Sequence, residues 1–341
     1  MSKAFVIVNA GQGEFADESV PAPSENQVLC APLRVGLCGT DRLVFGGKMP
    51  AVQYPRIPGH EVAALVVENR SSRALAAGSF VCIDPYKNCG RCHACRAGRP
   101  NCCQYNQTLG VQRDGIMRER FLVDADRVYP LPKGVDPAVF CLVEPVTLGL
   151  HILQRAGNVA GKWCLVAGVG NVGRLLVCLL KERGAKVIAW DISDKRLESA
   201  GRWGADVAVN AKDPAAEERV YEVTKKDGVD VAFEVAGKPD AVETVLRLAA
   251  FAGKVVLVGH STQASSVRGS DVVFKELDIV GSRNSHGQFP EAIRLIAADP
   301  GKWESMISHR FTFDHAADAF RLSHGDSDSF NKIAVDFPEK A

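Results

Sequence analysis

The rhythm of apolar and polar positions changes near residue 150. Before that point, short segments rich in β-branched residues stand between glycine and proline turns, a pattern typical of strands. The clearest of these segments are 5–9, 27–35, 61–68 and 79–84. We therefore expect residues 1–150 to form a compact, barrel-like β domain.

From residue 162 to about 282, apolar strands alternate with segments of helical periodicity. Strands are expected at 163–167, 186–191, 206–210, 229–235, 254–259 and 278–281. The intervening helices are expected near 171–183, 194–203, 214–226 and 240–251. Buried strands separated by helices predict a parallel sheet with right-handed crossovers. The fold class is therefore α/β, with a six-stranded doubly wound (Rossmann) sheet over residues 151–282, the size of a complete dinucleotide-binding sheet.

The last stretch, residues 283–341, is too short for a third domain. It contains a helical pattern at 290–298, a strand-like segment at 309–313, a helix after Asp314 and a final strand near 332–337. We expect these pieces to return to the first domain and complete it.

Composition narrows the choice of partners. The chain is 46% hydrophobic and 24% charged, which is an ordinary balance for a soluble globular protein. A net charge of +1 provides no global field for nucleic acid or an anionic membrane, so neither is expected as a partner. No apolar run approaches the roughly 20 residues that span a bilayer. An odd count of 11 cysteines and an amino end without a secretory leader predict the reducing cytoplasm.

A dense cysteine loop occupies residues 89–103. Four cysteines follow the pattern C-x2-C-x2-C-x7-C and can close a tetrahedron on one structural zinc: Cys89, Cys92, Cys95 and Cys103. Disulfides and an iron–sulfur cluster are the alternatives. The odd cysteine count argues against the first, and the lack of a second cluster motif argues against the second. Cys102 is a spare neighbour, since the spacing favours Cys103.

A glycine-rich turn follows the strand at 163–167 and opens the next helix, as a dinucleotide-binding loop must. Its glycines allow the tight turn, the approach of a pyrophosphate and close helix packing, and the helix amino terminus favours the anion. The expected cofactor residues here are Gly168, Gly170, Asn171, Val172 and Gly173. The alternative is an ordinary glycine turn.

Asp191 ends the second strand of this predicted sheet. A carboxylate there accepts hydrogen bonds from ribose hydroxyls and repels a 2′-phosphate, which predicts NAD over NADP. Lys195 and Arg196 follow closely and soften that preference; Arg196 is also expected to contact the cofactor. Val258 and Gly259, at the end of the fifth strand, complete this set.

A second group of metal-type residues lies in the β domain: Cys38, His60, Glu61 and Glu144. Singly, each has a structural reading: a buried cysteine, a satisfied histidine, a carboxylate that closes a turn. Together they offer a soft ligand, an imidazole and carboxylates, whereas a catalytic zinc needs about three protein ligands and one open position. Spacing alone leaves both readings open.

With these motifs in place, the chain resembles the zinc-dependent medium-chain alcohol dehydrogenases, in particular the branch of sorbitol, threonine and sugar-acid dehydrogenases. The resemblance covers nearly the whole chain. It rests on GLCGTD (36–41), YPRIPGHE (54–61), the cysteine loop, DGIMRERF (114–121), VEP (143–145), GVGNVG (168–173) and VGSRN (280–284). It implies a GroES-like catalytic domain with the cofactor domain inserted before its last segment. It also implies homodimers or homotetramers, commonly paired through the strand at 278–281.

The resemblance further implies two zinc ions per chain, one structural and one catalytic. Cys38 and His60 would hold the catalytic zinc, with Glu61 or Glu144 as the acidic ligand. Zinc would act as a Lewis acid on the alcohol, Thr40 would take the proton, and NAD would accept the hydride. The family often has a histidine at the outer relay position, where this chain has Leu43. Ile116 and Met117 replace the usual glycine and aromatic residue.

The expected substrate is a secondary alcohol of a sugar, polyol or sugar acid, because Glu144 in place of a third sulfur makes the metal site harder. Arg283 and Asn284 fall where this branch often places polar groups near substrate or nicotinamide. Arg283 would then pair with a substrate carboxylate or phosphate; the alternative is that it binds only backbone or cofactor. Two further readings remain: a non-catalytic NAD-binding regulator that keeps the fold, and a zinc-independent reductase of the same superfamily.

Overall fold

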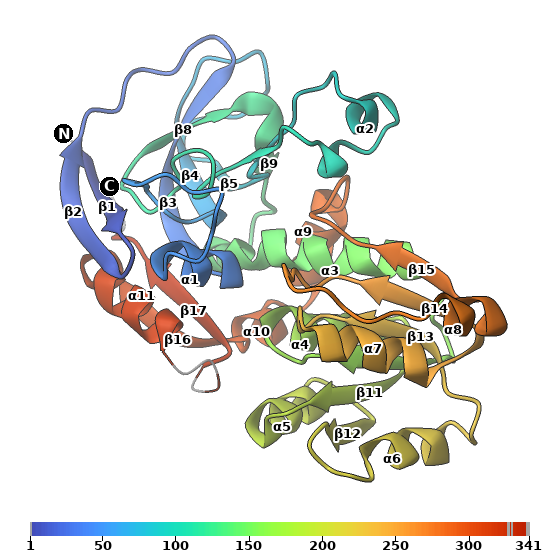
Figure 1. Ribbon diagram of the computed structural model, residues 1–341. Helices are drawn as coiled ribbons and strands as arrows, with labels where there is room; N and C mark the ends of the chain where they lie inside the picture. The colour runs from blue at the N-terminus through green and yellow to red at the C-terminus, as the bar shows by residue number, and fades with distance from the viewer. Residues whose placement is uncertain (1, 326–327, 329, 339–341) are drawn as a thin grey trace. The chain divides into compact units, whose positions relative to one another are not determined.

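The computed structural model describes residues 2–325, 328 and 330–338. It divides into two units, shown in Figure 1. Unit 1 comprises Met1–Thr147 together with His286–Ala341, and unit 2 comprises Leu148–Ser285. Each unit has its own apolar core. The boundaries expected from the sequence, near residues 150 and 282, lie within a few residues of these two boundaries in the structure.

Unit 1 is built on a seven-stranded sheet in the order β16-β17-β3-β4-β5-β9, with β8 paired to β3. The strands are β3 Gln27–Leu37, β4 Glu61–Asn69, β5 Phe80–Ile83, β8 Phe121–Asp124, β9 Val128–Pro130, β16 Ile307–Thr312 and β17 Lys332–Asp336. A hairpin of β1 Ser2–Asn9 and β2 Gln12–Glu18 packs Phe5 against Phe320 of α11 Ala316–His324. The cysteine loop leaves this unit as an excursion that carries α2 His93–Arg96 (Figure 1).

The carboxyl-terminal segment enters this sheet by pairing β17 antiparallel with β3, Val335 opposite Val35. A buried ion network reinforces the join. Arg34 is 2% exposed, and its guanidinium contacts Asp336 of β17 and Glu304 of α10 Pro300–Glu304. A buried guanidinium needs such partners, because an unpaired buried charge is strongly destabilising. The network therefore ties the two ends of unit 1 together.

Unit 2 is a parallel six-stranded sheet in the order β12-β11-β10-β13-β14-β15. Its strands are β10 Trp163–Ala167, β11 Lys186–Asp191, β12 Val207–Asn210, β13 Val229–Glu234, β14 Ala249–Leu257 and β15 Asp278–Gly281. The helices are α4 Asn171–Glu182, α5 Asp194–Arg202, α6 Ala216–Val223, α7 Pro239–Leu248 and α8 Gly269–Lys275. The strand order reverses between β10 and β13. In such sheets ligands bind beyond the carboxyl ends of the strands at this switch point.

Several elements were not expected from the sequence, among them β2, α1 Gly39–Phe45, α8 and α3 Val143–Ala156. The motif at Glu144-Pro145 was open to a turn interpretation, but a proline is tolerated in the first turn of a helix, and α3 begins there. The helical stretch Pro137–Ala156 is long and apolar enough to cross a membrane, although the sequence analysis found no apolar run of that length. Because 72% of its apolar window is buried within the protein, it has the burial of a core helix.

Candidate metal centres and cofactor loop

The cysteine loop gathers four thiols. The sulfur atoms of Cys89, Cys92, Cys95 and Cys103 all lie within 4.8 Å of one another. Cys92 Sγ lies 3.5 Å from Cys95 Sγ, close to the roughly 3.8 Å that two thiolates adopt on a tetrahedral zinc with bonds of about 2.3 Å. Cys102 is not in this group. The donor set therefore fits one tetrahedral zinc.

Backbone amides prepare these sulfurs to carry negative charge. The N–H of Cys92 donates to Cys89 Sγ, and the N–H of Cys89 donates to Cys103 Sγ, each over 3.3 Å. The backbone N–H of Cys95 contributes most to lowering the pKa of Cys92 to about 6. Since a metal binds the thiolate and not the thiol, these donors favour metal binding.

Cys38 and His60 form the centre of a second donor group. Cys38 follows β3 and is the N-cap of α1, and His60 directly precedes β4. Cys38 Sγ lies 3.3 Å from His60 Nε2, close to the roughly 3.6 Å that tetrahedral zinc geometry gives for a sulfur and a nitrogen ligand. The two donors are positioned to share one metal ion.

Asp41 joins the two segments that carry these donors, and the sequence interpretation missed this role. Its side chain is fully buried; Oδ2 accepts the N–H of Cys38 at 3.0 Å, and Oδ1 accepts the N–H of Gly59 at 3.1 Å. Asp41 lies within 4.8 Å of Cys38 and His60, and each of its oxygens already accepts one backbone N–H. We infer that Asp41 holds the segments of Cys38 and His60 in place through these hydrogen bonds. The spacing Cys-x-x-Asp is that of a helix capping box, and this signal could have revealed it.

The electrostatics of His60 reflect this crowding. Burial lowers the pKa of the imidazole, but the negative charges of Cys38 and Asp41 outweigh burial and raise that pKa well above its usual value. The ring's Nδ1 is buried and has no hydrogen-bond partner in the part of the chain that the structure describes. The site therefore surrounds the imidazole with negative potential, which favours the binding of a cation at Nε2 beside Cys38.

The two candidate carboxylates lie outside the 4.8 Å donor group but in its immediate surroundings. Glu61, on β4, forms a buried ion pair with Lys332 of β17. Glu144, in the first turn of α3, accepts a hydrogen bond from the hydroxyl of Tyr86. Burial raises the pKa of Glu144 to about 7, while the charge of His60 lowers it and that of Glu61 raises it. All these groups therefore share one buried electrostatic environment.

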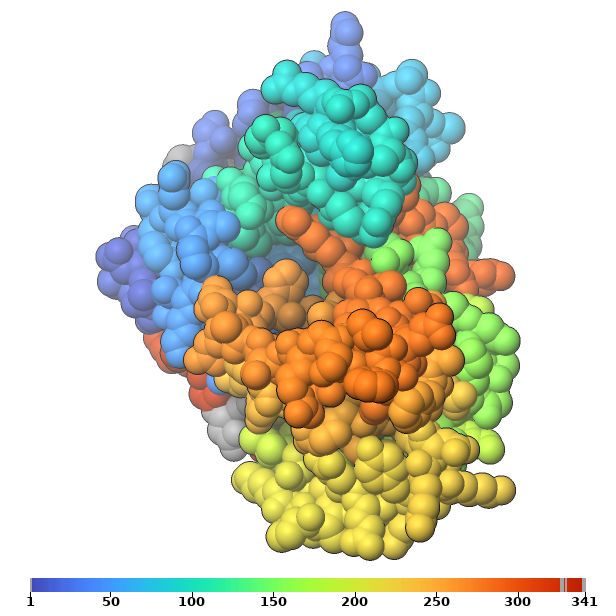
Figure 2. Space-filling view, turned by 45° about the vertical axis from the view of Figure 1, so that its right-hand side comes forward, coloured from blue at the N-terminus to red at the C-terminus, as the bar shows by residue number. Residues whose placement is uncertain are grey.

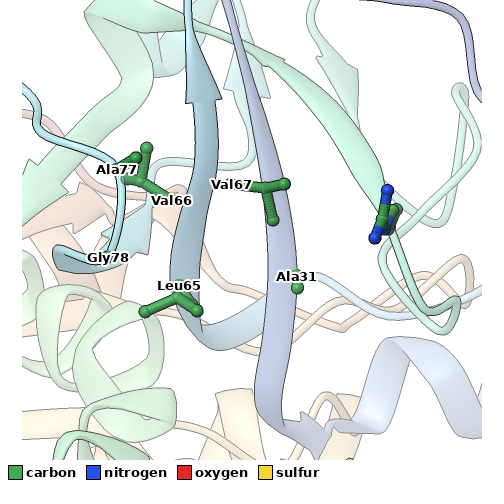
Figure 3. A pocket seen from close by; sticks show the side chains of 7 residues that line it. Ala31, Leu65, Val66, Val67, Ala77 and Gly78 are labelled. Carbon is green, nitrogen blue, oxygen red and sulfur yellow. The ribbon is translucent and has the colours of Figure 1, made fainter. Parts of the chain in front are cut away.

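Thr40 and Leu43 lie on the same short helix as Asp41, α1. Thr40 is half-buried, and Leu43 is 39% exposed. A separate hollow of about 240 Å³ lies elsewhere in unit 1 and is lined by residues of β3, β4 and the loop after β4, among them Ala31, Leu65 and Gly78 (Figure 3). None of its lining residues is a metal donor, so we assign it no part in the site.

The glycine-rich loop in unit 2 joins β10 to α4. Gly168 has a φ of +96°, and a Cβ there would lie 2.6 Å from the backbone nitrogen of Ala236. A Cβ on Gly173 would lie 2.0 Å from the carbonyl oxygen of Gly168. Gly170 is the N-cap of α4 and has open space beside it. Asn171 and Val172 begin α4, whose amino terminus can therefore accept an anion.

Asp191 lies at the carboxyl end of β11 and is 5% exposed. Its Oδ2 accepts the N–H of Val169 in the glycine-rich loop at 2.9 Å, and Oδ1 accepts the N–H of Ser193 at 3.1 Å. Arg196 approaches Oδ1 to 3.7 Å. The carboxylate thus fixes the loop in addition to its expected role toward a ribose.

The remaining predicted cofactor residues also lie in unit 2. The N–H groups of Val258 and Gly259 donate to the carbonyl oxygen of Glu234 at 2.9 and 3.1 Å. Arg283 and Asn284 follow β15, and Asn284 has a left-handed φ of 49°. The sequence interpretation missed Glu234. Its carboxylate is 1% exposed and accepts the N–H of Gly237 at 2.6 Å, which fixes the turn after β13.

Two family models match the chain. The alcohol dehydrogenase GroES-like domain matches residues 24–133, and the zinc-binding dehydrogenase model matches residues 171–298. An uncharacterized zinc-type alcohol dehydrogenase-like protein of Haemophilus influenzae is 34% identical over 92% of each chain. The L-galactonate-5-dehydrogenase of Escherichia coli is 32% identical over 90% of each chain.

Solved structures agree with these matches. A structure described as a short chain alcohol dehydrogenase from Escherichia coli, complexed with NADH, has a TM-score of 0.92 at 30% identity and covers 98% of this chain and 99% of its own. A putative zinc-binding dehydrogenase from Sinorhizobium meliloti, bound to NADP, has a TM-score of 0.89 at 30% identity, with the same two shares covered. The two structures therefore differ in the nicotinamide cofactor they contain.

Proposed function

The chain belongs to the family of zinc-type medium-chain alcohol dehydrogenases, and from that premise we propose that it oxidises a secondary alcohol of a polyol, sugar or sugar acid with NAD. The family makes it an alcohol dehydrogenase-type oxidoreductase with a zinc ion, a nicotinamide cofactor and a small-molecule alcohol as substrate. The specific alcohol class, the preference for NAD and the assignment of residues are our proposal.

One observation carries the proposal. Cys38 Sγ and His60 Nε2 lie 3.3 Å apart, and Asp41 fixes both segments through backbone hydrogen bonds. A chain that kept the fold only as a regulator would have no reason to retain a soft donor, an imidazole and two buried carboxylates in one place. Glu144 or Glu61 would supply an oxygen donor where a third sulfur would make the site softer.

The chemistry divides between the bound groups and the chain. A zinc ion held by Cys38, His60 and an acidic ligand, Glu144 or Glu61, would supply Lewis acidity toward a hydroxyl, and bound nicotinamide would supply the hydride acceptor. Thr40, two residues after Cys38, would accept the hydroxyl proton at Oγ1. Since Leu43 provides no titratable group at the next relay position, the proton would leave through water.

We propose two zinc ions per chain. The second is structural and held by Cys89, Cys92, Cys95 and Cys103, whose sulfurs lie within 4.8 Å of one another. Such a closed four-sulfur set has no position open for a substrate.

Asp191 supports NAD over NADP. A 2′-phosphate would meet a buried carboxylate that is already anchored by two backbone N–H groups. Arg196, 3.7 Å from that carboxylate, offers a partial counter-charge and softens the preference. We expect Gly168, Gly170, Asn171, Val172, Gly173, Val258 and Gly259 to line the dinucleotide, and Arg283 and Asn284 to lie near substrate or nicotinamide.

A homodimer or homotetramer is also part of the proposal. Phe251, Val273 and Phe274 are 71%, 78% and 79% exposed on β14 and α8, next to the edge strand β15. Figure 2 shows this part of unit 2, in orange, facing the viewer. Exposed apolar groups beside an unpaired edge strand favour pairing with a second copy. We expect the cytoplasm as the compartment, with neither nucleic acid nor membrane as partner.

The test is an NAD-reduction screen with zinc-loaded protein over polyols, sugar acids, sugar phosphates and amino-alcohols, run in parallel with NADP. We expect turnover with a secondary alcohol of the first three classes, faster with NAD. Absence of turnover in a protein that contains two zinc ions and binds NADH would favour the regulator instead.

A further inference from the structure

Two buried side chains each hold one of the two candidate carboxylates. The hydroxyl of Tyr86, a residue only 5% exposed, donates to Oε1 of Glu144. Lys332 Nζ forms an ion pair with Oε2 of Glu61. Glu144 and Glu61 are 3% and 1% exposed, so each carboxylate is held mainly by protein groups. The partners differ in kind, because one is a neutral donor and the other a cation.

This difference decides which carboxylate is available to a metal ion. Lys332 already neutralises Glu61, and a metal that recruited Glu61 would compete with that buried ammonium for the same carboxylate. Tyr86 donates a single hydrogen bond to one oxygen and adds no positive charge beside Glu144. Oε2 of Glu144 has no hydrogen-bond partner among the described residues, so it remains open to a cation.

The position of Tyr86 comes from the base of the cysteine loop. Tyr86 begins β6 Tyr86–Lys87, which pairs with β7 Gln107–Thr108 on the far side of the loop. Its N–H donates to Asp84 Oδ1 at 3.0 Å, and Asp84 pairs with Arg127 at 3.0 Å. The base of the cysteine loop therefore also fixes the position of Tyr86, which contacts Glu144 near Cys38 and His60.

Lys332 reaches the same surroundings from the other end of the chain. It opens β17, whose register places Ile333 opposite Leu37, the residue before Cys38. Its side chain is 9% exposed. The pairing of β17 with β3 fixes the backbone position of Lys332. The ion pair between Lys332 and Glu61 therefore depends on the completed sheet of unit 1.

We propose that Tyr86 and Lys332 are positioning residues that sort the two carboxylates, Tyr86 presenting Glu144 to the catalytic metal and Lys332 withholding Glu61 from it. This inference rests on the proposed function, because it presumes a metal between Cys38 and His60. Neither residue is assigned a contact with substrate or with the reacting atoms.

The experiment uses the full-length protein with Co²⁺ exchanged into the Cys38–His60 site and zinc left in the cysteine loop. The readouts are the Co²⁺ dissociation constant, from competition with a chelator, and the visible Co²⁺ spectrum. We expect Tyr86→Phe to weaken Co²⁺ binding about 10- to 100-fold, the usual effect of removing an outer-shell partner. The ligand-field bands should shift, while the thiolate charge-transfer band from Cys38 should persist. Tyr129→Phe is the matched control, since it removes a hydroxyl from β9 in the same unit.

Lys332→Met tests the second half of the proposal, the ion pair that holds Glu61. Release of Glu61 should leave Co²⁺ binding as tight or tighter and change the ligand-field bands, and adding Glu61→Gln should restore the original spectrum. The double variant also guards against misfolding, because it removes both charges of the pair.

Unchanged Co²⁺ affinity and spectrum in Tyr86→Phe, or loss of binding in Glu61→Gln but not in Glu144→Gln, would overturn the inference. The proposed function fails separately, if wild-type protein shows no thiolate band from Cys38 and oxidises no alcohol.

Discussion

The two candidate metal centres of unit 1 are assembled in opposite ways. The cysteine loop places its four sulfurs within one stretch, 89–103, and its own backbone amides donate to them. The other group combines Cys38, which follows β3, and His60, which precedes β4, with Glu144 of α3 and Lys332 of β17 in their surroundings. A local centre can form with its loop, whereas a dispersed centre exists only when the sheet is complete. We therefore expect the first to govern stability and the second to govern chemistry.

The largest effect should come from the dispersed centre. Cys38→Ser is expected to lose the catalytic zinc and to lower kcat/KM by about 1,000-fold or more, because Lewis-acid stabilisation is worth several kcal/mol at about 1.4 kcal/mol per tenfold. Folding and the second zinc should remain. Steady-state NAD reduction and zinc content per chain check this. Cys102→Ser, a cysteine outside both donor groups, serves as the control. Retained turnover in Cys38→Ser contradicts the assignment.

The next largest effect should come from the local centre. Cys92→Ser is expected to lower Tm by roughly 10 °C and to impair assembly, since a structural zinc contributes several kcal/mol of folding free energy and 1 kcal/mol moves Tm by about 2–4 °C at this domain size. Thermal unfolding and sedimentation with Cys102→Ser alongside measure it. If Cys92→Ser is as stable and assembled as wild type but inactive, the division of roles between the centres is wrong.

These two centres also show what the sequence can and cannot predict. The spacing of Cys89, Cys92, Cys95 and Cys103 is sufficient because all four ligands are local. The parallel sheet could also be predicted from the sequence. The strands expected at 163–167, 186–191 and 278–281 have the bounds observed for β10, β11 and β15.

Contacts between segments that are distant in the sequence could not be predicted. No local pattern places Lys332 against Glu61 or Tyr86 against Glu144, because the register of β17 on β3 and the path of the cysteine loop decide them. For the same reason, the choice between Glu61 and Glu144 stayed open from sequence alone. Helix α3 was missed because Glu144-Pro145 was open to a turn interpretation, although proline is compatible with a first helical turn.

The glycine-rich loop offers an intermediate case, in which one carboxylate both fixes a loop and faces a cofactor. Asp191→Ala is expected to lower kcat/KM for NAD about 10- to 100-fold, since hydrogen bonds to charged groups are worth about 1.5–3 kcal/mol. The value for NADP should fall less, because a repulsive charge is also removed. The ratio of the two kcat/KM values is the measurement. Asp194→Ala removes an exposed carboxylate of the same turn as a control. An unchanged ratio would exclude Asp191 as the discriminating residue.

The smallest effect should come from Leu43, which is 39% exposed on α1. Leu43→His supplies a titratable group at the outer relay position and should raise kcat by no more than about tenfold. This is below the roughly 100- to 10,000-fold typical of general acid–base catalysis, because water already removes the proton. Stability should hardly change at such an exposed site. The pH profile of kcat, compared with that of Leu43→Gln, separates proton transfer from simple polarity. An identical profile for both variants would place the proton exit elsewhere.

The most direct test of the dispersed centre is anomalous diffraction at the zinc absorption edge, from crystals grown with zinc and NAD. We predict two peaks per chain, one enclosed by the four sulfurs of the cysteine loop and one bound by Cys38 Sγ and a ring nitrogen of His60. A single peak in the cysteine loop, with ordered side chains at Cys38 and His60 and no ion between them, would contradict the account.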